Sequence, residues 1–256
     1  MSRDILTVLG SSSGLPQADR ATSGYLLKTG HSLSLIDCGG GITSSFLRRG
    51  FNPLDVDRIF ISHTHPDHVC ELPLFIQLIY LRGREKPLEV FVPDEFVAPL
   101  KGYLPAVYIL ENKLPFELRI TGYEHGFVFD EDFRLEAIGN SHLHPYREFI
   151  ESAGLPNKMQ CHSFKIQVNG RSVLYSADIG SFDDLRDHLE GTDIVIIEST
   201  HLDLDQFLKF AQTAKVGRYI LTHLGSKEDV AEINLRAAKA VVDNLTTAVD
   251  GMEIEL

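Results

Sequence analysis

The chain has 256 residues, of which 43% are hydrophobic and 23% are charged, the proportions of a globular protein with a sizeable core. Its length suits one large domain spanning residues 1–256. The 24 basic and 36 acidic residues give a formal net charge of −12, which disfavours an extended nucleic-acid track because such a track needs a basic face.

Short β-rich segments alternate with helical ones through the first half of the chain. Predicted strands cover residues 5–9, 23–27, 33–36, 58–61 and 88–92, and predicted helices cover residues 42–49 and 68–81. Pro73 falls in the first turns of the second helix, where proline is tolerated. Segment 93–114 contains three prolines, and its pattern predicts no single element.

The second half continues this alternation. Predicted strands cover residues 116–121, 126–129, 133–138, 164–168, 171–175, 193–197 and 218–223, and the apolar spacing of residues 204–214 predicts an amphipathic helix. Asn169 and Gly170 lie between two of these strands, and this pair predicts a tight hairpin turn.

The two halves of the chain resemble each other. Segments 33–36 and 171–175 are each followed by an aspartate, Asp37 and Asp178, and segment 218–223 resembles segment 58–63. Two similar β/α halves predict an α/β protein in which two sheets pack face to face with helices outside. Polar residues at the strand ends would then meet at one rim of the sandwich.

The segment 61–68, Ile-Ser-His-Thr-His-Pro-Asp-His, is the clearest functional motif. It places three histidines and an aspartate within six positions directly after a predicted strand. Side chains at i and i+2 of an extended segment point to the same side, so His63 and His65 can bind one metal ion. Asp67 and His68 can turn toward a second ion. Mixed imidazole and carboxylate ligands suit Zn²⁺, Mn²⁺ or Fe²⁺.

Four later residues are candidate partners of this motif, and the pattern alone leaves their roles open. Asp178 follows a strand and could bridge two cations, but aspartate is also common at such turns for backbone reasons. His223 ends a strand, either as a ligand or as a partly buried structural histidine. His142 and His144 compete for one position after strand 133–138, and we prefer His142 by its position.

These residues give the chain a family resemblance. It resembles the metallo-β-lactamase-fold hydrolases through an ordered set of residues: His63, His65, Asp67, His68, His142, Asp178 and His223. More narrowly it resembles ribonuclease Z, the tRNA 3′-processing endonuclease, but without the arm that grips tRNA, because segment 164–173 turns tightly. The likeness covers most of the chain, including segments 9–16, 36–39 and 220–223. It implies a four-layer αβ/βα sandwich.

The resemblance also implies two divalent metal ions, with zinc expected and manganese or iron as the alternatives. It assigns the ligands by position: His63, His65 and His142 to one ion, Asp67, His68 and His223 to the other, and Asp178 to both. The two ions would share a hydroxide as the nucleophile, and they would offset the negative charge that develops on the substrate oxygen.

A proton donor follows from the same resemblance. Phosphodiesterases of this family use a histidine that is not a ligand, oriented by an upstream glutamate, to protonate the leaving group. His201, three positions after Glu198, matches that place, and imidazole suits the task because it titrates near neutrality. The alternative is a helix-capping or surface histidine. Asp67, Glu198 and His201 form the expected catalytic group.

Three features depart from the family pattern: Glu71, the extra segment 143–162, and Ala177-Asp178-Ile179, which stands where the family usually has Gly-Asp-Thr. Glu71 stands where the family often has glycine, and its longer acidic side chain could crowd or repel a polyanionic substrate near the metals. Cys70 is either an extra ligand or a core residue. The extra segment 143–162 predicts a short helix, and its role as a lid, a dimer contact or a surface excursion stays open.

Together these features predict a binuclear metal-dependent phosphodiesterase that acts on an RNA 3′ end or on a small or cyclic nucleotide. A metal-dependent hydrolase of carboxylic esters, lactones or thioesters is the first alternative, and a non-catalytic metal-binding module is the second. The expected partner is the hydrolysable substrate. RNA is an alternative partner that the net charge does not support, and a homodimer is a further alternative.

Cysteine use and hydropathy bear on location. Cys38, Cys70 and Cys161 form no Cys-x-x-Cys pair, so we expect a reducing compartment rather than a disulfide framework. No apolar segment is long enough to span a bilayer, and no signal segment precedes the first predicted strand. These observations predict a cytoplasmic protein with no membrane partner.

Overall fold

The computed structural model describes residues 3–30 and 32–256, whose strands form two seven-stranded sheets. The first sheet has the order β14 (Glu253–Glu255), β1 (Ile5–Gly10), β2 (Gly24–Lys28), β3 (Leu33–Ile36), β4 (Val56–Phe60), β5 (Leu88–Pro93), β6 (Leu118–Tyr123). The second sheet has the order β13 (Leu245–Thr247), β12 (Arg218–Thr222), β11 (Ile194–Glu198), β10 (Arg171–Tyr175), β9 (His162–Val168), β8 (Arg134–Gly139), β7 (Val128–Asp130).

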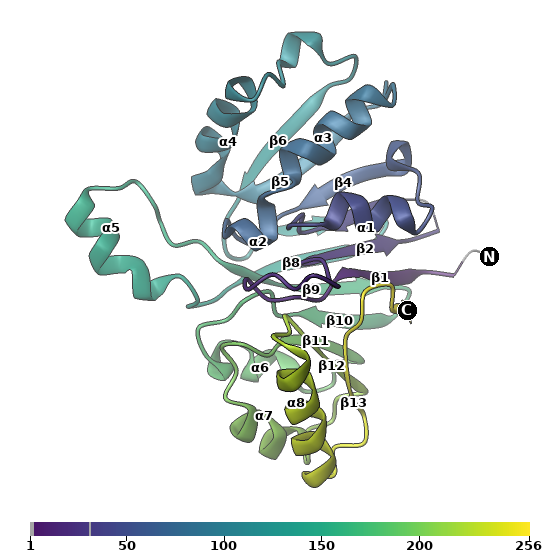
Figure 1. Cartoon of the computed structure of the whole chain (residues 1–256), viewed down its shortest axis with the longest axis vertical. Coiled ribbons are helices and arrows are strands. Elements are labelled where there is room, and N and C mark those ends of the chain that lie inside the picture. Colours follow the sequence, from purple (N-terminus) through teal and green to yellow (C-terminus); the bar gives the residue numbers. More distant parts are fainter. Residues whose placement is uncertain (1–2, 31) are drawn as a thin grey trace.

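Helices cover the outer faces of both sheets (Figure 1). Those beside the first sheet are α1 (Ile42–Arg48), α2 (Pro66–Val69), α3 (Leu72–Leu81) and α4 (Asp94–Ala106). Those beside the second sheet are α6 (Arg186–Leu189), α7 (Leu204–Ala211) and α8 (Lys227–Lys239). α5 (Arg147–Ala153) stands apart from the body of the molecule in Figure 1.

Three apolar layers separate the four layers of secondary structure. One layer lies between the two sheets, and the other two lie between each sheet and its helices. Alternation along the strands builds them, because successive side chains point to opposite faces. In β11, for example, Ile194 and Ile196 face the other sheet, whereas Val195 and Ile197 face the helices. The expected four-layer αβ/βα sandwich is confirmed.

The structure confirms the predicted hairpin at 169–170 and changes the helix predicted over 68–81. The predicted hairpin at Asn169 and Gly170 is confirmed, with φ of 48° and 80° at the two turn residues, and it pairs Val168 with Arg171. The helix predicted over 68–81 is formed over Leu72–Leu81 as α3, but Cys70 and Glu71 separate it from the short helix α2, so the predicted start is wrong. Glu71 is the N-cap of α3, which places Pro73 in the first turn of that helix.

Segment 93–114, which had no sequence assignment, contains α4 with Pro99 and Pro105 inside it. Proline removes an amide donor from a helix interior and normally disfavours it. Leu100 and Leu104 are nearly fully buried in the layer between the helices and the first sheet. Tertiary packing of these side chains therefore outweighs the low helix propensity of the segment.

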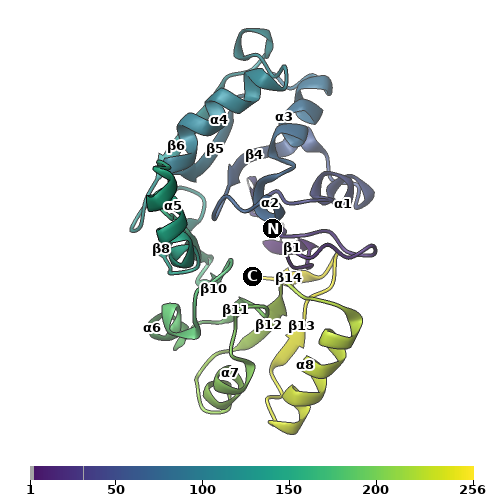
Figure 2. The same ribbon diagram turned by 60° about the vertical axis from the view of Figure 1, so that its left-hand side comes forward.

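The strands that lead to the predicted site end at one rim. β3 and β4 are parallel neighbours, as are β10, β11 and β12, so their carboxyl ends lie at the same edge of each sheet. The contacts that join the halves near this edge include a β-bridge between Ser12 and Leu224 and a hydrogen bond from His162 N–H to Ser62 O (3.2 Å). The face-to-face packing therefore brings residues from both halves into one place (Figure 2).

Candidate metal centre

The loop after β4 presents the histidine motif. His65 is the N-cap of α2, with an extended backbone (φ −61°, ψ 144°), and Pro66 is the first helical residue. Proline is favoured at that position because its missing amide would have no helical partner there. His63 and His65 therefore extend from a strand-like segment, while His68 lies on the first helical turn and is fully buried, as is His63.

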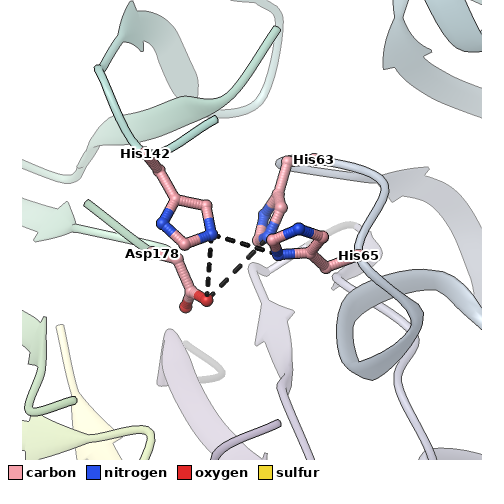
Figure 3. A group of neighbouring side chains, drawn as sticks. All are labelled: His63, His65, His142 and Asp178. Carbon is pink, nitrogen blue, oxygen red and sulfur yellow. Dashed lines mark hydrogen bonds and ion pairs between the residues drawn. The ribbon is translucent and has the colours of Figure 1, made fainter. Parts of the chain in front are cut away.

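Four side chains converge in a first group, shown in Figure 3: His63, His65, His142 and Asp178. One potential ligand atom from each lies within 4.8 Å of the others. His142 Nε2 is 3.1 Å from His65 Nδ1 and 3.6 Å from Asp178 Oδ2, and His63 Nε2 is 3.9 Å from the same carboxylate oxygen. These residues come from both halves of the chain.

A second group contains Asp67, His68, His223 and again Asp178. His223 Nε2 lies 3.0 Å from Asp67 Oδ2 and 3.5 Å from Asp178 Oδ1. His68 Nε2 lies 3.2 Å from the same Asp178 oxygen. Asp178 thus directs Oδ2 toward the first group and Oδ1 toward the second, which is the geometry of a bridging carboxylate.

The hydrogen-bond pattern tests whether a metal fits these groups. His63 Nε2, His68 Nε2 and Asp178 Oδ1 are buried without a hydrogen-bond partner among the described residues. Buried polar atoms are normally paired, because an unpaired one costs roughly 1–3 kcal/mol. Three such atoms directed into one small space, on imidazole and carboxylate groups, fit the ligand set of a borderline divalent cation.

Burial and nearby carboxylates shift the pKa values of the histidines in opposite directions. Desolvation lowers the pKa of His63 well below its usual value and lowers the pKa of His142 to about 4. Burial also acts to lower the pKa of His68, but the charges of Asp178 and Asp37 outweigh it and raise that pKa well above its usual value. Since metal ions bind neutral imidazole, His63 and His142 are already in the binding form at neutral pH.

Asp37, at the end of β3, holds His68 in place. Its Oδ2 accepts hydrogen bonds from His68 Nδ1 (2.8 Å), Tyr175 OH (2.7 Å) and Ser62 Oγ (2.8 Å), and its Oδ1 accepts from Ser62 N–H (2.7 Å). A donor at Nδ1 leaves Nε2 of His68 as the nitrogen that faces Asp178. Sequence reasoning predicted His68 as a ligand but assigned no role to Asp37, Ser62 or Tyr175, although the place of Asp37 directly after a predicted strand was a usable signal.

Glu198 and His201 form a pair beside both groups. Glu198 is fully buried, and its Oε1 lies 3.0 Å from Nδ1 of His201, whose side chain is 40% exposed. Glu198 Oε2 also accepts the His201 backbone N–H (2.9 Å), and the side-chain hydrogen bond is the main cause of a raised His201 pKa. The His201 ring centroid is 4.7 Å from that of His142 and 6.2 Å from that of His223.

The structure corrects the interpretation of Glu71. Its carboxylate accepts hydrogen bonds from Gly41 N–H and Thr43 N–H, both at 2.7 Å, at the beginning of α1. The side chain therefore stabilises the start of a helix, and the expectation that it crowds the metal site is wrong. Cys70 is exposed, so its interpretation as a core residue is wrong.

Other predicted features find a place near the centre. His144 is exposed and joins none of the ligand groups formed by the described residues, whereas His142 does. The helix predicted within 143–162 is α5, which ends at Gly154 in a left-handed conformation (φ 62°).

None of the helices formed by residues 3–30 and 32–256 is long and apolar enough to cross a membrane.

Comparison with known proteins agrees with this geometry. The model of the beta-lactamase superfamily domain matches residues 34–224, and the chain belongs to that superfamily. Ribonuclease Z of Methanothermobacter thermautotrophicus is 27% identical over 98% of this chain and 96% of its own. The chain is a metal-dependent hydrolase, as shown by its superfamily, by its ribonuclease Z relative and by its two groups of candidate metal ligands.

Solved structures share the fold. The metallo-beta-lactamase fold protein YhfI from Bacillus subtilis has a TM-score of 0.78 and 22% identity, covering 99% of this chain and 100% of that one. Human tRNase Z, short form, has a TM-score of 0.70 and 20% identity, covering 98% of each chain. At these identities the likeness establishes the fold alone.

Proposed function

We propose that the protein is a binuclear metal-dependent phosphodiesterase. The proposed ligands are His63, His65 and His142 for one ion, Asp67, His68 and His223 for the other, and Asp178 for both. Zinc suits this mixed nitrogen and oxygen set, with manganese and iron as the alternatives. When bound, two such ions supply an activated water as the nucleophile and offset the charge that develops on the phosphoryl oxygens.

The observation that carries this proposal is the pairing of Glu198 with His201. The buried carboxylate holds Nδ1 of the imidazole at 3.0 Å, so Nε2, on the opposite side of the ring, is free to face a substrate. His201 lies against His142 and near His223, so it adjoins both ligand groups. A departing alkoxide needs a proton, and an imidazole oriented in this way can donate it. We place Asp67 with this pair in the catalytic group, as the carboxylate that contacts His223.

The substrate is proposed to be a phosphodiester of a nucleotide, either at an RNA 3′ end or in a small or cyclic nucleotide. The name of the relative from Methanothermobacter thermautotrophicus, ribonuclease Z, supports the first form. The two-residue turn between β9 and β10 leaves no long arm at that position, and the net charge is −12, which together favour the smaller substrate.

The test compares His201→Ala with the wild-type protein, both loaded with zinc or manganese. Two phosphodiesters are needed, one with an aryl leaving group and one with an alkoxide leaving group. We expect turnover to fall at least about tenfold in the variant with the alkoxide substrate, because general acid catalysis contributes roughly 10²–10⁴-fold. The fall is expected to be smaller with the aryl substrate, whose leaving group needs less help.

His144→Ala is the matched control, because His144 is an exposed histidine outside the ligand groups. An equal, small effect of both variants on the alkoxide substrate would remove His201 from the reaction. Metal-loaded protein that hydrolyses neither phosphodiester, but does hydrolyse a lactone or thioester, would replace the proposed function with the ester alternative.

A further inference from the structure

Segment 143–159 forms most of an open pocket of about 350 Å³ beside the metal centre. Its apolar wall consists of Leu143, Tyr146, Phe149, Ile150, Leu155 and Met159. Phe149 is 71% exposed, Leu155 53% and Tyr146 48%, on the projecting segment that carries α5 (Figures 1 and 2). Large apolar side chains gathered at a surface pocket indicate a binding site, because exposure to water is unfavourable for them.

The pocket and the metal centre share a wall. His65 belongs to the first ligand group and also lines the pocket, and its ring packs edge-on against Tyr146, with 5.7 Å between centroids and 73° between planes. Leu143 directly follows His142 in the chain. A molecule bound in the pocket therefore lies next to the first ligand group, so the natural occupant is a part of the molecule that is cleaved.

Anchors at the far end of the segment keep the pocket formed. Gln160 N–H donates to Glu95 Oε1 (2.7 Å), and Glu95 N–H donates to Gln160 Oε1 (2.8 Å). Lys158 Nζ lies 2.8 Å from Asp94 Oδ2 at the start of α4. The segment is thus held at His142 on one side and at α4 on the other, which reduces the ordering cost of binding.

The chemistry of the lining selects the occupant. Among the residues that the structure describes, no lysine or arginine lines the pocket, and Glu95 contributes a carboxylate, so an anionic phosphate is disfavoured there. The aromatic rings of Tyr146 and Phe149 suit a flat group, and Thr64 and Asn157 add groups that can form hydrogen bonds. An uncharged planar group with polar edges meets all of these conditions.

We infer that this pocket binds the nucleobase of the nucleotide whose phosphodiester is cleaved, with Tyr146 and Phe149 as its stacking residues. The inference rests on the proposed phosphodiesterase function and names the part of the substrate that the protein recognises. Proteins commonly bind unpaired bases by stacking them on aromatic side chains, and loss of one such ring weakens binding roughly five- to a hundredfold.

The first test uses two substrates with the same leaving group, thymidine 5′-p-nitrophenyl phosphate and methyl p-nitrophenyl phosphate. Phe149→Ala is expected to raise KM for the thymidine compound at least about fivefold more than for the methyl compound. Tyr103→Ala removes an aromatic ring that is 52% exposed on α4, outside the pocket, and should leave both values unchanged. An equal effect of Phe149→Ala on both substrates would overturn the inference.

A binding measurement separates this inference from the proposed function. Calorimetry with metal-loaded protein compares 5′-AMP with ribose 5-phosphate, and it needs no turnover. We expect AMP to bind at least about fivefold more tightly, and Phe149→Ala to remove that difference. Equal affinity for the two ligands would overturn the inference that the pocket binds a nucleobase. Failure to hydrolyse any phosphodiester would overturn the proposed function but not the binding of a base in the pocket.

The source of the base is found by repeating the Phe149→Ala comparison with a short single-stranded RNA and with 3′,5′-cyclic AMP. The substrate whose KM rises more identifies the source for which the pocket is built. An absence of effect on both would contradict the inference.

Discussion

Replacing Asp37 by asparagine tests how the fold orients His68, a proposed metal ligand. Asp37 is fully buried and accepts four hydrogen bonds, three of them at Oδ2. Its backbone is left-handed, with φ of 60°. Asparagine tolerates that conformation better than most residues, so Asp37→Asn changes the side-chain chemistry without adding backbone strain.

The magnitude follows from the hydrogen-bond geometry. The amide oxygen of asparagine can replace Oδ2, but its NH₂ group then meets the Ser62 N–H, so one hydrogen bond becomes a contact between two donors. The remaining bonds also lose their charged acceptor. Since a hydrogen bond to a charged group contributes about 1.5–3 kcal/mol, we expect unfolding of the metal-free protein to become easier by about 3 kcal/mol.

The effect on the metal site follows from His68. Without a charged acceptor at Nδ1, the orientation and tautomer of His68 are less well fixed, and loss of such a partner typically lowers metal affinity 10–100-fold. Urea denaturation of the metal-free protein and zinc titration against a chromogenic chelator measure the two effects. Tyr175→Phe is the control, because it removes one donor to Asp37 but keeps the contact with His68. Wild-type affinity and stability in Asp37→Asn would refute this reasoning.

Two further predictions concern stability. Adding zinc at about a hundred times its dissociation constant should stabilise the metal-free protein by about 2.7 kcal/mol, because the metal binds only the folded ligand groups. Thermal unfolding with zinc and with a chelator measures this effect, and an unchanged melting temperature would contradict the proposed metal site. Glu71→Gln should destabilise the protein by about 1–2 kcal/mol, because the charged acceptor for Gly41 N–H and Thr43 N–H at the start of α1 is lost. Zinc titration of that variant should match the wild type, and weaker zinc binding with unchanged stability would place Glu71 at the metals instead.

Sequence reasoning succeeded where the relevant residues lie close together in the chain. Segment 61–68 supplies four of the seven residues in the two ligand groups, and alternation within strands such as β11 encodes which side chains face which layer. For His142, Asp178 and His223 the local pattern left alternatives open, because their meeting depends on the packing of two sheets. The resemblance to a known family, whose ligands occur in the same order along the chain, supplied the assignment of these three residues.

Other features depend on contacts that no local pattern records. The direction of Glu71 follows from how α3 packs beside α1, and the four donors to Asp37 come from His68, Ser62 and the distant Tyr175. The C-terminal strand β14 pairs with β1, at the opposite end of the chain. The pocket beside His65 is lined both by α5 and by the start of α4, which are far apart in the sequence. Each of these depends on tertiary structure rather than on residue spacing.

Packing between the sheets explains why Ala177 is tolerated at the rim despite the strain of its backbone. Asp37, Ala177 and His223 follow strands of the two sheets and have φ of 60°, 49° and 54°, a conformation that costs a residue with a side chain about 1–2 kcal/mol. Glycine would avoid this cost. At Asp37 and His223 the side chain itself is needed in the centre, so glycine is excluded. Ala177 stands where the family usually has glycine, and its methyl group is buried between the sheets, with 1% exposure. Packing therefore offsets strain at Ala177, whereas at the other two positions strain accompanies the placement of a polar side chain in the proposed metal centre.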